Sequence, residues 1–101
     1  MTPDEVGDYA ESLAGCRRKG TESRPAWYVR DRLVARLADP TTLVVRVHME
    51  DREPLLDAHP GTFGVPPRFE AHHKVEAYLD HGDPDAIREA IRLAWDAQRS
   101  W

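Results

Sequence analysis

The sequence predicts an α+β fold in which an antiparallel sheet carries helices on one of its faces. Segments in the middle of the chain are rich in β-branched residues and alternate between apolar and polar positions, as strands do. Amphipathic segments with helix-capping signals stand at both ends. The short connections favour antiparallel pairing. We therefore expect one two-layer domain over residues 1–101, with the element order α-β-β-β-α-β-β-α.

The first helix is expected to begin at Pro3. Thr2 is a typical N-cap residue, proline suits the first helical position, and Glu5 completes a capping box. Apolar residues then recur at helical spacing: Val6, Tyr9, Ala10 and Leu13. The basic run Arg17–Lys19 is expected at the C-terminal end of this helix, where the helix dipole favours cations.

A hairpin and a third strand are expected next. The hairpin strands cover Ala26–Arg30 and Leu33–Leu37, and Asp31 suits the tight turn between them because it tolerates a positive φ. A second turn at Asp39–Thr41 leads into Thr42–His48, which is rich in β-branched residues and is expected to be a strand.

The following segment predicts a short helix and two more extended pieces. The helix should cover Glu50–Ala58, although Pro54 is acceptable only near a first turn, so a late or irregular start is expected. Phe63–Val65 is a short extended piece that ends at two prolines, and His73–Leu79 is a strand.

The closing helix is signalled by Asp83 as the N-cap and Pro84 at the first helical position. Its apolar residues form an i, i+3, i+4, i+7, i+8 stripe that indicates one buried face. The stripe consists of Ile87, Ala90, Ile91, Ala94 and Trp95.

Alternation of side chains divides the expected sheet into an apolar face and a basic face. The apolar face collects Leu33, Ala35, Leu37, Leu43, Val45, Val47, Val75, Ala77 and Leu79. The other face collects Val34, Arg36, Val44, Arg46, His48, Lys74, Glu76 and Tyr78, with Tyr28 expected beside them. Helices covering the apolar face would leave the basic face open. Because the chain has a formal net charge of −4, positive charge gathered on one face indicates anion binding.

Several segments, taken in order, resemble one protein family, the MmcQ/YjbR family. They are Pro25–Leu37, Asp51–Leu56 followed by Pro60–Phe69, and Asp83–Trp95. The resemblance extends over about residues 6–95. It implies a CyaY-like fold, related to bacterial frataxin, and a proposed role in DNA binding of a "double wing" type, without catalytic residues to carry over. The sequence differs from the family's pattern at His72–His73, where relatives often have an aromatic residue.

The candidate nucleic-acid-binding residues follow from the basic face and the loop tips. Arg36, Arg46 and Lys74 are expected to contact phosphates, Tyr28 and Tyr78 to stack on bases, and Arg30, Arg32 and Arg68 to act as wings along a backbone. A solvated face with cross-strand Arg–Glu pairs would explain the same pattern. The alternatives are a small-molecule-binding or antibiotic-resistance accessory protein, with a pocket between the sheet and the Phe63–Phe69 loop, and a protein-interaction module.

Other chemistry finds little support in the sequence. No catalytic constellation or phosphate loop is present, so no enzyme activity and no cofactor are expected. No histidine or cysteine spacing indicates a metal site, and capping explains the acidic residues of the first helix better than weak iron binding does. Cys16, the one cysteine, precedes a basic run that would activate a thiol, although a buried structural role is the commoner one. With neither a signal peptide nor a membrane span expected, the prediction is a cytoplasmic monomer that binds DNA weakly.

Overall fold

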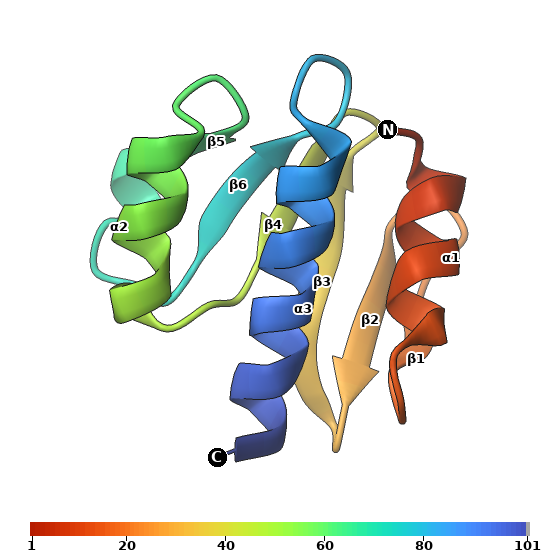
Figure 1. The fold of residues 1–101 in the computed structure, drawn as a ribbon. Coiled ribbons are helices and arrows are strands. Elements are labelled where there is room, and N and C mark those ends of the chain that lie inside the picture. Colours follow the sequence, from red (N-terminus) through yellow and green to blue (C-terminus); the bar gives the residue numbers. More distant parts are fainter. Residues whose placement is uncertain (101) are drawn as a thin grey trace.

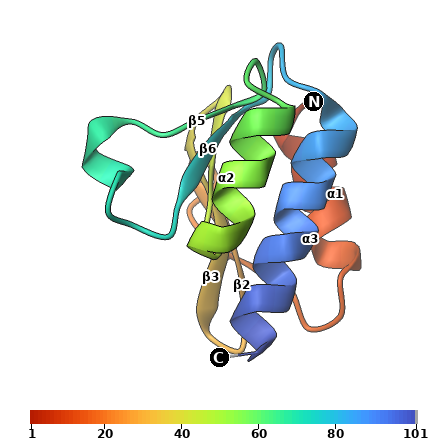
Figure 2. The ribbon, with the colours of Figure 1, turned by 60° about the vertical axis from the view of Figure 1, so that its left-hand side comes forward.

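The computed structural model describes residues 1–100, which form three helices and one six-stranded sheet (Figure 1). The elements are α1 (Pro3–Ser12), β1 (Arg17–Gly20), β2 (Pro25–Val29), β3 (Arg32–Asp39), β4 (Thr42–Val45), α2 (Met49–Ala58), β5 (Phe63–Gly64), the 3₁₀ turn η1 (Pro67–Phe69), β6 (Val75–Tyr78) and α3 (Pro84–Ser100). The strand order is β1-β2-β3-β4-β6-β5 and every neighbouring pair is antiparallel. All these helices lie on the same side of the sheet (Figures 1 and 2). The predicted two-layer α+β fold is confirmed.

The core lies between the sheet and the helices. Trp27 on β2 is fully buried, and the α3 stripe packs against the sheet with Ile87 and Ile91 at its centre. The last residue of that stripe, Trp95, is only half-buried, and its indole N–H donates to the carbonyl of Ala14 at 2.8 Å. This bond ties the α1–β1 connection to the middle of α3.

The N-terminal helix begins as predicted but ends earlier. Thr2 and Glu5 form the expected capping box, yet α1 stops at Ser12 and the run Arg17–Gly20 is an edge strand paired with β2. The prediction that the basic run belongs to the end of this helix was wrong. Gly15 adopts a positive φ of 73°, which turns the chain, and pairing with β2 then gives the backbone of the run its hydrogen-bond partners.

A β-bulge in β3 changes which residues face the core. Trp27 pairs with Ala35 and Tyr28 with Leu33, so Val34 is the extra residue on its strand. Val34 is therefore fully buried in the core, while Leu33 is partly exposed on the other side of the sheet. The alternation predicted from the sequence placed Leu33 on the apolar face and Val34 on the basic face. This assignment was wrong, because a bulge interrupts the alternation of side chains between the two faces.

Helix α2 forms in spite of its proline. Pro54 lies inside Met49–Ala58, so the expected late start was wrong. Residues on both sides of the proline hold the helix in place, since the Arg52 and Leu55 side chains are both buried. Tertiary contacts of this kind outweigh the loss of one helical hydrogen bond.

The buried Arg52 guanidinium holds the long connection between β5 and β6. Its Nη1 donates to the carbonyls of Phe69, His72 and Lys74 at 3.0, 2.7 and 3.3 Å, and its Nη2 donates to that of Glu70 at 3.0 Å. We call residues 65–74 the η1 loop. Figure 2 shows that this loop projects from the sheet on the side away from the helices.

None of the helices within residues 1–100 combines the length and the apolar character that a membrane-spanning segment requires.

Candidate nucleic-acid interface

The sheet surface that faces away from the helices is called the open face. Residues paired across neighbouring strands point to the same side, so the register assigns its members. They are Arg17, Lys19, Ala26, Tyr28, Leu33, Arg36, Asp39, Thr42, Val44, Arg46, Gly64, Lys74, Glu76 and Tyr78. Most of the strand residues predicted for the basic face lie here. The exceptions are Val34, which Leu33 replaces, and His48, because β4 ends at Val45 and His48 is the N-cap of α2.

Three cations come together on the open face, near the end of β4 and the start of β6. The pKa of Lys74 is lowered from its usual value, first by burial and then by the charges of Arg36 and Arg46. Within residues 1–100, neither Arg36 nor Lys74 forms a salt bridge. The fold therefore holds like charges close together without a carboxylate to offset those of Arg36 and Lys74, and an anion bound there would relieve their repulsion.

The edge strand β1 adds two cations that the sequence prediction missed. Arg17 pairs with Tyr28 and Lys19 pairs with Ala26, so both side chains belong to the open face. The Lys19 Nζ lies 5.2 Å from the centre of the Tyr28 ring and 2.9 Å from a carboxylate oxygen of Asp31. The sequence signal for a strand is the pair Gly15 and Gly20, because glycines on both sides of a short segment indicate turns. In the structure both glycines adopt a positive φ.

The aromatic candidates occupy opposite parts of the open face. Tyr28 is half-buried beneath Lys19, and Tyr78 stacks on His81 with ring centres 5.4 Å apart and planes at 21°. The Tyr78 hydroxyl lies directly over Gly64, where any larger side chain would collide with it. Burial and the charge of Glu76 raise the pKa of Tyr78, so its phenol stays protonated and able to donate a hydrogen bond.

Arg68 reaches the open face from the η1 loop. Its guanidinium forms a salt bridge with Glu76 at 3.1 Å and lies over the Phe69 ring at 4.6 Å, while Lys74 covers the same ring at 5.3 Å. Arg68 thus joins the surface to which Arg36 and Lys74 belong. Its pairing with Glu76 is also the kind of Arg–Glu contact that an ordinary solvated face would contain.

Arg30 and Arg32 are placed differently from the other candidates. Arg30 donates to the carbonyl of Arg99 at 2.7 Å, and Arg32 donates to that of Gln98 at 3.1 Å. These carbonyls belong to the last turn of α3, where the backbone carbonyls have no partner N–H group within the helix. Both arginines therefore support the end of α3. Arg30 also lines a pocket of about 200 Å³ beside Arg17, Lys19 and Tyr28 of the open face, whereas Arg32 does not line that pocket.

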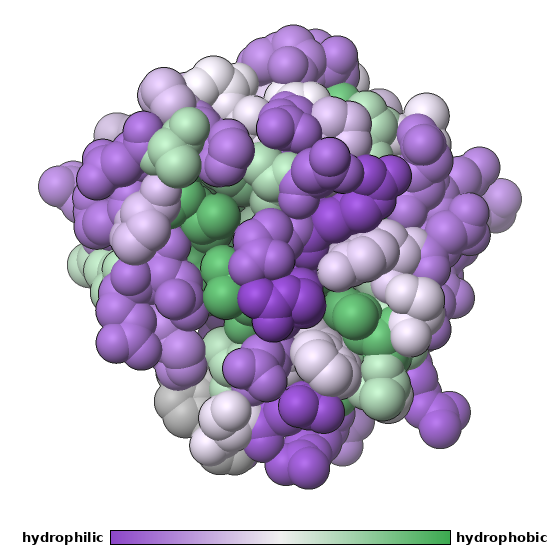
Figure 3. All heavy atoms as spheres, viewed as in Figure 1, coloured by the Kyte–Doolittle hydropathy of each residue, from purple (hydrophilic) through white to green (hydrophobic). Residues whose placement is uncertain are grey.

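The helix side of the molecule arranges its charges in pairs. On α3, Arg88 bonds to Asp85 at 3.1 Å and Arg92 to Glu89 at 2.7 Å. Figure 3 shows this side, where hydrophilic residues surround narrow apolar strips. The paired charges of α3 contrast with the cation cluster of the open face.

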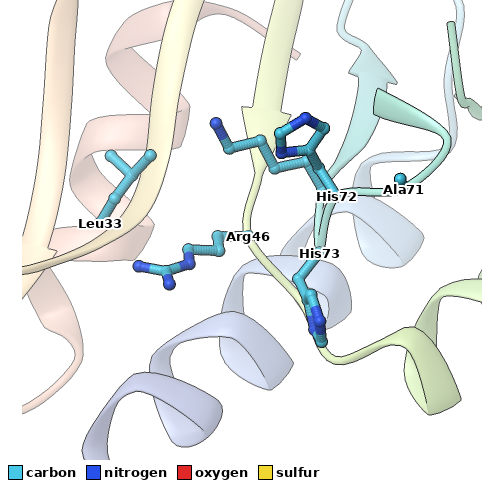
Figure 4. Close-up of a pocket in the computed structure, with 6 residues that line it drawn as sticks. Leu33, Arg46, Ala71, His72 and His73 are labelled. Atoms are coloured by element: carbon cyan, nitrogen blue, oxygen red, sulfur yellow. The ribbon is translucent and has the colours of Figure 1, made fainter. Parts of the chain in front are cut away.

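A pocket of about 300 Å³ lies at one end of the open face, against the η1 loop (Figure 4). It is lined by Leu33, Arg46, Ala71, His72, His73 and Lys74. Arg46 extends toward Leu33, whereas His72 and His73 project in different directions. The pocket therefore has an apolar wall at Leu33 of β3 and a basic wall at Arg46 and Lys74.

Two of the acidic residues of α1, Glu5 and Glu11, make contacts within the protein. Glu5 accepts the N–H of Thr2 in the capping box, and Glu11 accepts the indole N–H of Trp27 at 3.1 Å and pairs with Arg18 at 3.4 Å. In the part of the chain that the structure describes, no three His, Cys, Asp or Glu side chains are grouped closely enough to hold a metal ion.

Cys16 is expected to be unreactive in the folded protein. Burial, with a smaller effect of Glu11, raises its pKa from 9.0 to about 11, so the thiolate is scarce at neutral pH. At pH 8 a thiol reagent should modify it about a hundredfold more slowly than in the unfolded chain, as a difference of two pKa values implies. Timed labelling with and without denaturant measures this, and equal rates would contradict a protected thiol.

The raised pKa of Cys16 also makes the free energy of unfolding depend on pH. Because the folded state favours the protonated thiol, its stabilising contribution is complete below pH 9 and is lost as the pH rises toward 11. A Cys16→Ala variant provides the control for denaturation measured over this range, since it lacks this part of the pH dependence.

Comparison with known proteins shows a structural relative. Neither a family model nor a curated protein matches the chain. The fold is similar to that of Deinococcus radiodurans protein DR2400, a crystal structure described as a DUF419 domain, with a TM-score of 0.75. The two chains are 21% identical, and the alignment covers 94% of this chain and 76% of the other. This similarity supports the fold.

Proposed function

We propose that the protein binds nucleic acid through its open face, as the resemblance to the MmcQ/YjbR family implies. The observation that carries the proposal is the cluster of Arg36, Arg46 and Lys74 in a chain whose formal net charge is −4. A phosphate backbone supplies the negative charges that such a cluster lacks.

A single strand suits this surface better than a duplex does. The bases of a single strand are free to stack on the partly exposed rings of Tyr28 and Tyr78, in place of Lys19 and His81, whereas those of a duplex are already stacked. The η1 loop also rises beside the sheet (Figure 2), which favours a flexible strand over a rigid rod. In addition, Arg30 and Arg32, which a duplex-binding wing would use, already bond to α3.

Binding should be weak and should fall steeply with salt concentration. If about four cations of the open face contact phosphates, log K should fall against log salt with a slope of about −3, which means roughly 60-fold weaker binding at 200 mM than at 50 mM. Fluorescence anisotropy of labelled oligonucleotides, titrated with the protein at both salt concentrations, measures the slope. The same titrations with single-stranded and duplex forms of one sequence rank the two ligands.

Two results would contradict the proposal. One is the absence of saturable binding at 50 mM salt up to a high protein concentration. The other is binding that does not change with salt, since contacts with phosphates release counterions.

A further inference from the structure

The pocket beside the η1 loop is held in shape from the helix side of the sheet. The fully buried Gln98 donates its amide Nε2–H to the backbone carbonyl of Arg46 at 3.1 Å. The buried Arg52 donates to the backbone carbonyls of His72 and Lys74 at 2.7 and 3.3 Å. Three of the four lining residues with nitrogen-bearing side chains, Arg46, His72 and Lys74, thus have their backbones fixed by buried polar side chains, which is how a preorganised binding site is built.

We propose that this pocket binds a phosphate monoester, either the terminal phosphate of a strand on the open face or that of a free nucleotide. The first of these sources rests on the proposed function. Arg46, Lys74 and His72 would donate to the phosphate oxygens, and Leu33 would contact the adjoining sugar or base.

The charge of the pocket favours a monoester over a phosphate within a strand. A monoester has a second pKa near 6 and carries nearly two negative charges at neutral pH, whereas a phosphodiester carries one. Two positive charges line the pocket, on Arg46 and Lys74, and the Arg36 guanidinium lies close enough to act on Lys74. A dianion offsets this charge better than a monoanion does.

The shape of the pocket favours the end of a strand. Residues 71–74 of the η1 loop form one of its walls, so a strand that lies along the sheet meets the loop there. Its volume of about 300 Å³ stands at the lower end of the range of ligand pockets and suits one nucleotide.

The test compares strands that differ only at their ends. A ten-nucleotide single strand labelled at a central base is prepared with a 5′-phosphate, with a 3′-phosphate and with hydroxyls at both ends. We expect at least one of the phosphorylated strands to bind about tenfold more tightly than the hydroxyl strand in anisotropy titrations. A deoxynucleoside monophosphate and its nucleoside are then titrated into ¹⁵N-labelled protein, and only the monophosphate should shift the signals of residues 71–74.

Two variants separate the pocket from the rest of the open face. Lys74→Gln should remove the preference for the phosphorylated strand and the response to the monophosphate. Arg17→Gln, at the far edge of the same face, should weaken the binding of every strand alike and leave the preference unchanged. Circular dichroism confirms that each variant is folded.

The outcomes for the pocket and for the proposed function are distinct. Equal binding of all three strands, together with no response to the monophosphate, would overturn the pocket and leave strand binding in place. A response to the monophosphate that depends on Lys74, in a protein that binds no strand, would support the pocket for a free nucleotide and overturn the proposed function. A preference for phosphate that survives in Lys74→Gln would overturn the assignment of the site.

Discussion

Replacing Arg52 with methionine is expected to lower the free energy of unfolding by roughly 3 kcal/mol. The wild-type guanidinium donates to four backbone carbonyls of the η1 loop. Methionine fills a similar volume but donates to none of them. In the variant, the four carbonyls either stay buried without a hydrogen-bond partner or become exposed to water because the loop has moved. Both outcomes lower the free energy of unfolding.

Urea denaturation followed by circular dichroism measures this loss, and the melting temperature should fall by about 15 °C in a domain of this size. The same substitution at the exposed Arg24 is the matched control and should change stability by less than about 0.5 kcal/mol. Amide hydrogen exchange should quicken most in residues 65–74. An Arg52→Met protein as stable as the Arg24→Met protein would show that the loop does not depend on this arginine.

The parts of the fold that depend on local signals could be predicted from the sequence. The capping box of Thr2 and Glu5 and the Asp83–Pro84 start of α3 are written in adjacent residues. The hairpin turn also depends on local residues. It was predicted at Asp31, and Arg30 and Asp31 adopt positive φ values of 52° and 61°. Interactions between near neighbours determine all of these features, so a single sequence is enough to indicate them.

The parts that depend on distant contacts could not be predicted. The strand β1 exists because β2 offers it an edge, and the bulge at Val34 exists because it buries that side chain in the core. The burial of Arg52 depends on carbonyls 17 to 22 residues away. Local pattern gave no reason to expect that an arginine between two acidic residues would be buried.

The candidate site was predicted where alternation in the sheet decides it. Arg36, Arg46, Lys74, Tyr28 and Tyr78 all lie on the open face, as the period-two pattern implies. The loop-tip arginines could not be placed in this way, because the direction of a loop side chain depends on which groups lie within its reach. Arg68 reaches the open face and bonds to Glu76, whereas Arg30 and Arg32 reach the end of α3.

Reversing two charges of the open face should abolish binding of nucleic acid. In the double variant Arg36→Glu with Lys74→Glu, carboxylates replace two members of the cation cluster and repel phosphates at its centre. We expect the affinity for a single strand at 50 mM salt to fall by roughly a hundredfold or more. Neither residue forms a salt bridge within residues 1–100, and the mutual repulsion of the cluster is relieved, so the fold should be retained.

The matched control reverses the same number of charges on the other side of the molecule. Arg88→Glu with Arg92→Glu on α3 changes the net charge by the same amount and leaves the open face intact. If the open face is the binding surface, this control should weaken binding only slightly, through the long-range effect of net charge, which salt screens within about 10 Å. Equal losses in the two double variants would mean that net charge and not the arrangement of the open face governs binding. Full binding by the Arg36→Glu, Lys74→Glu protein would remove this surface as the site, because two carboxylates in place of two cations of the cluster repel phosphates.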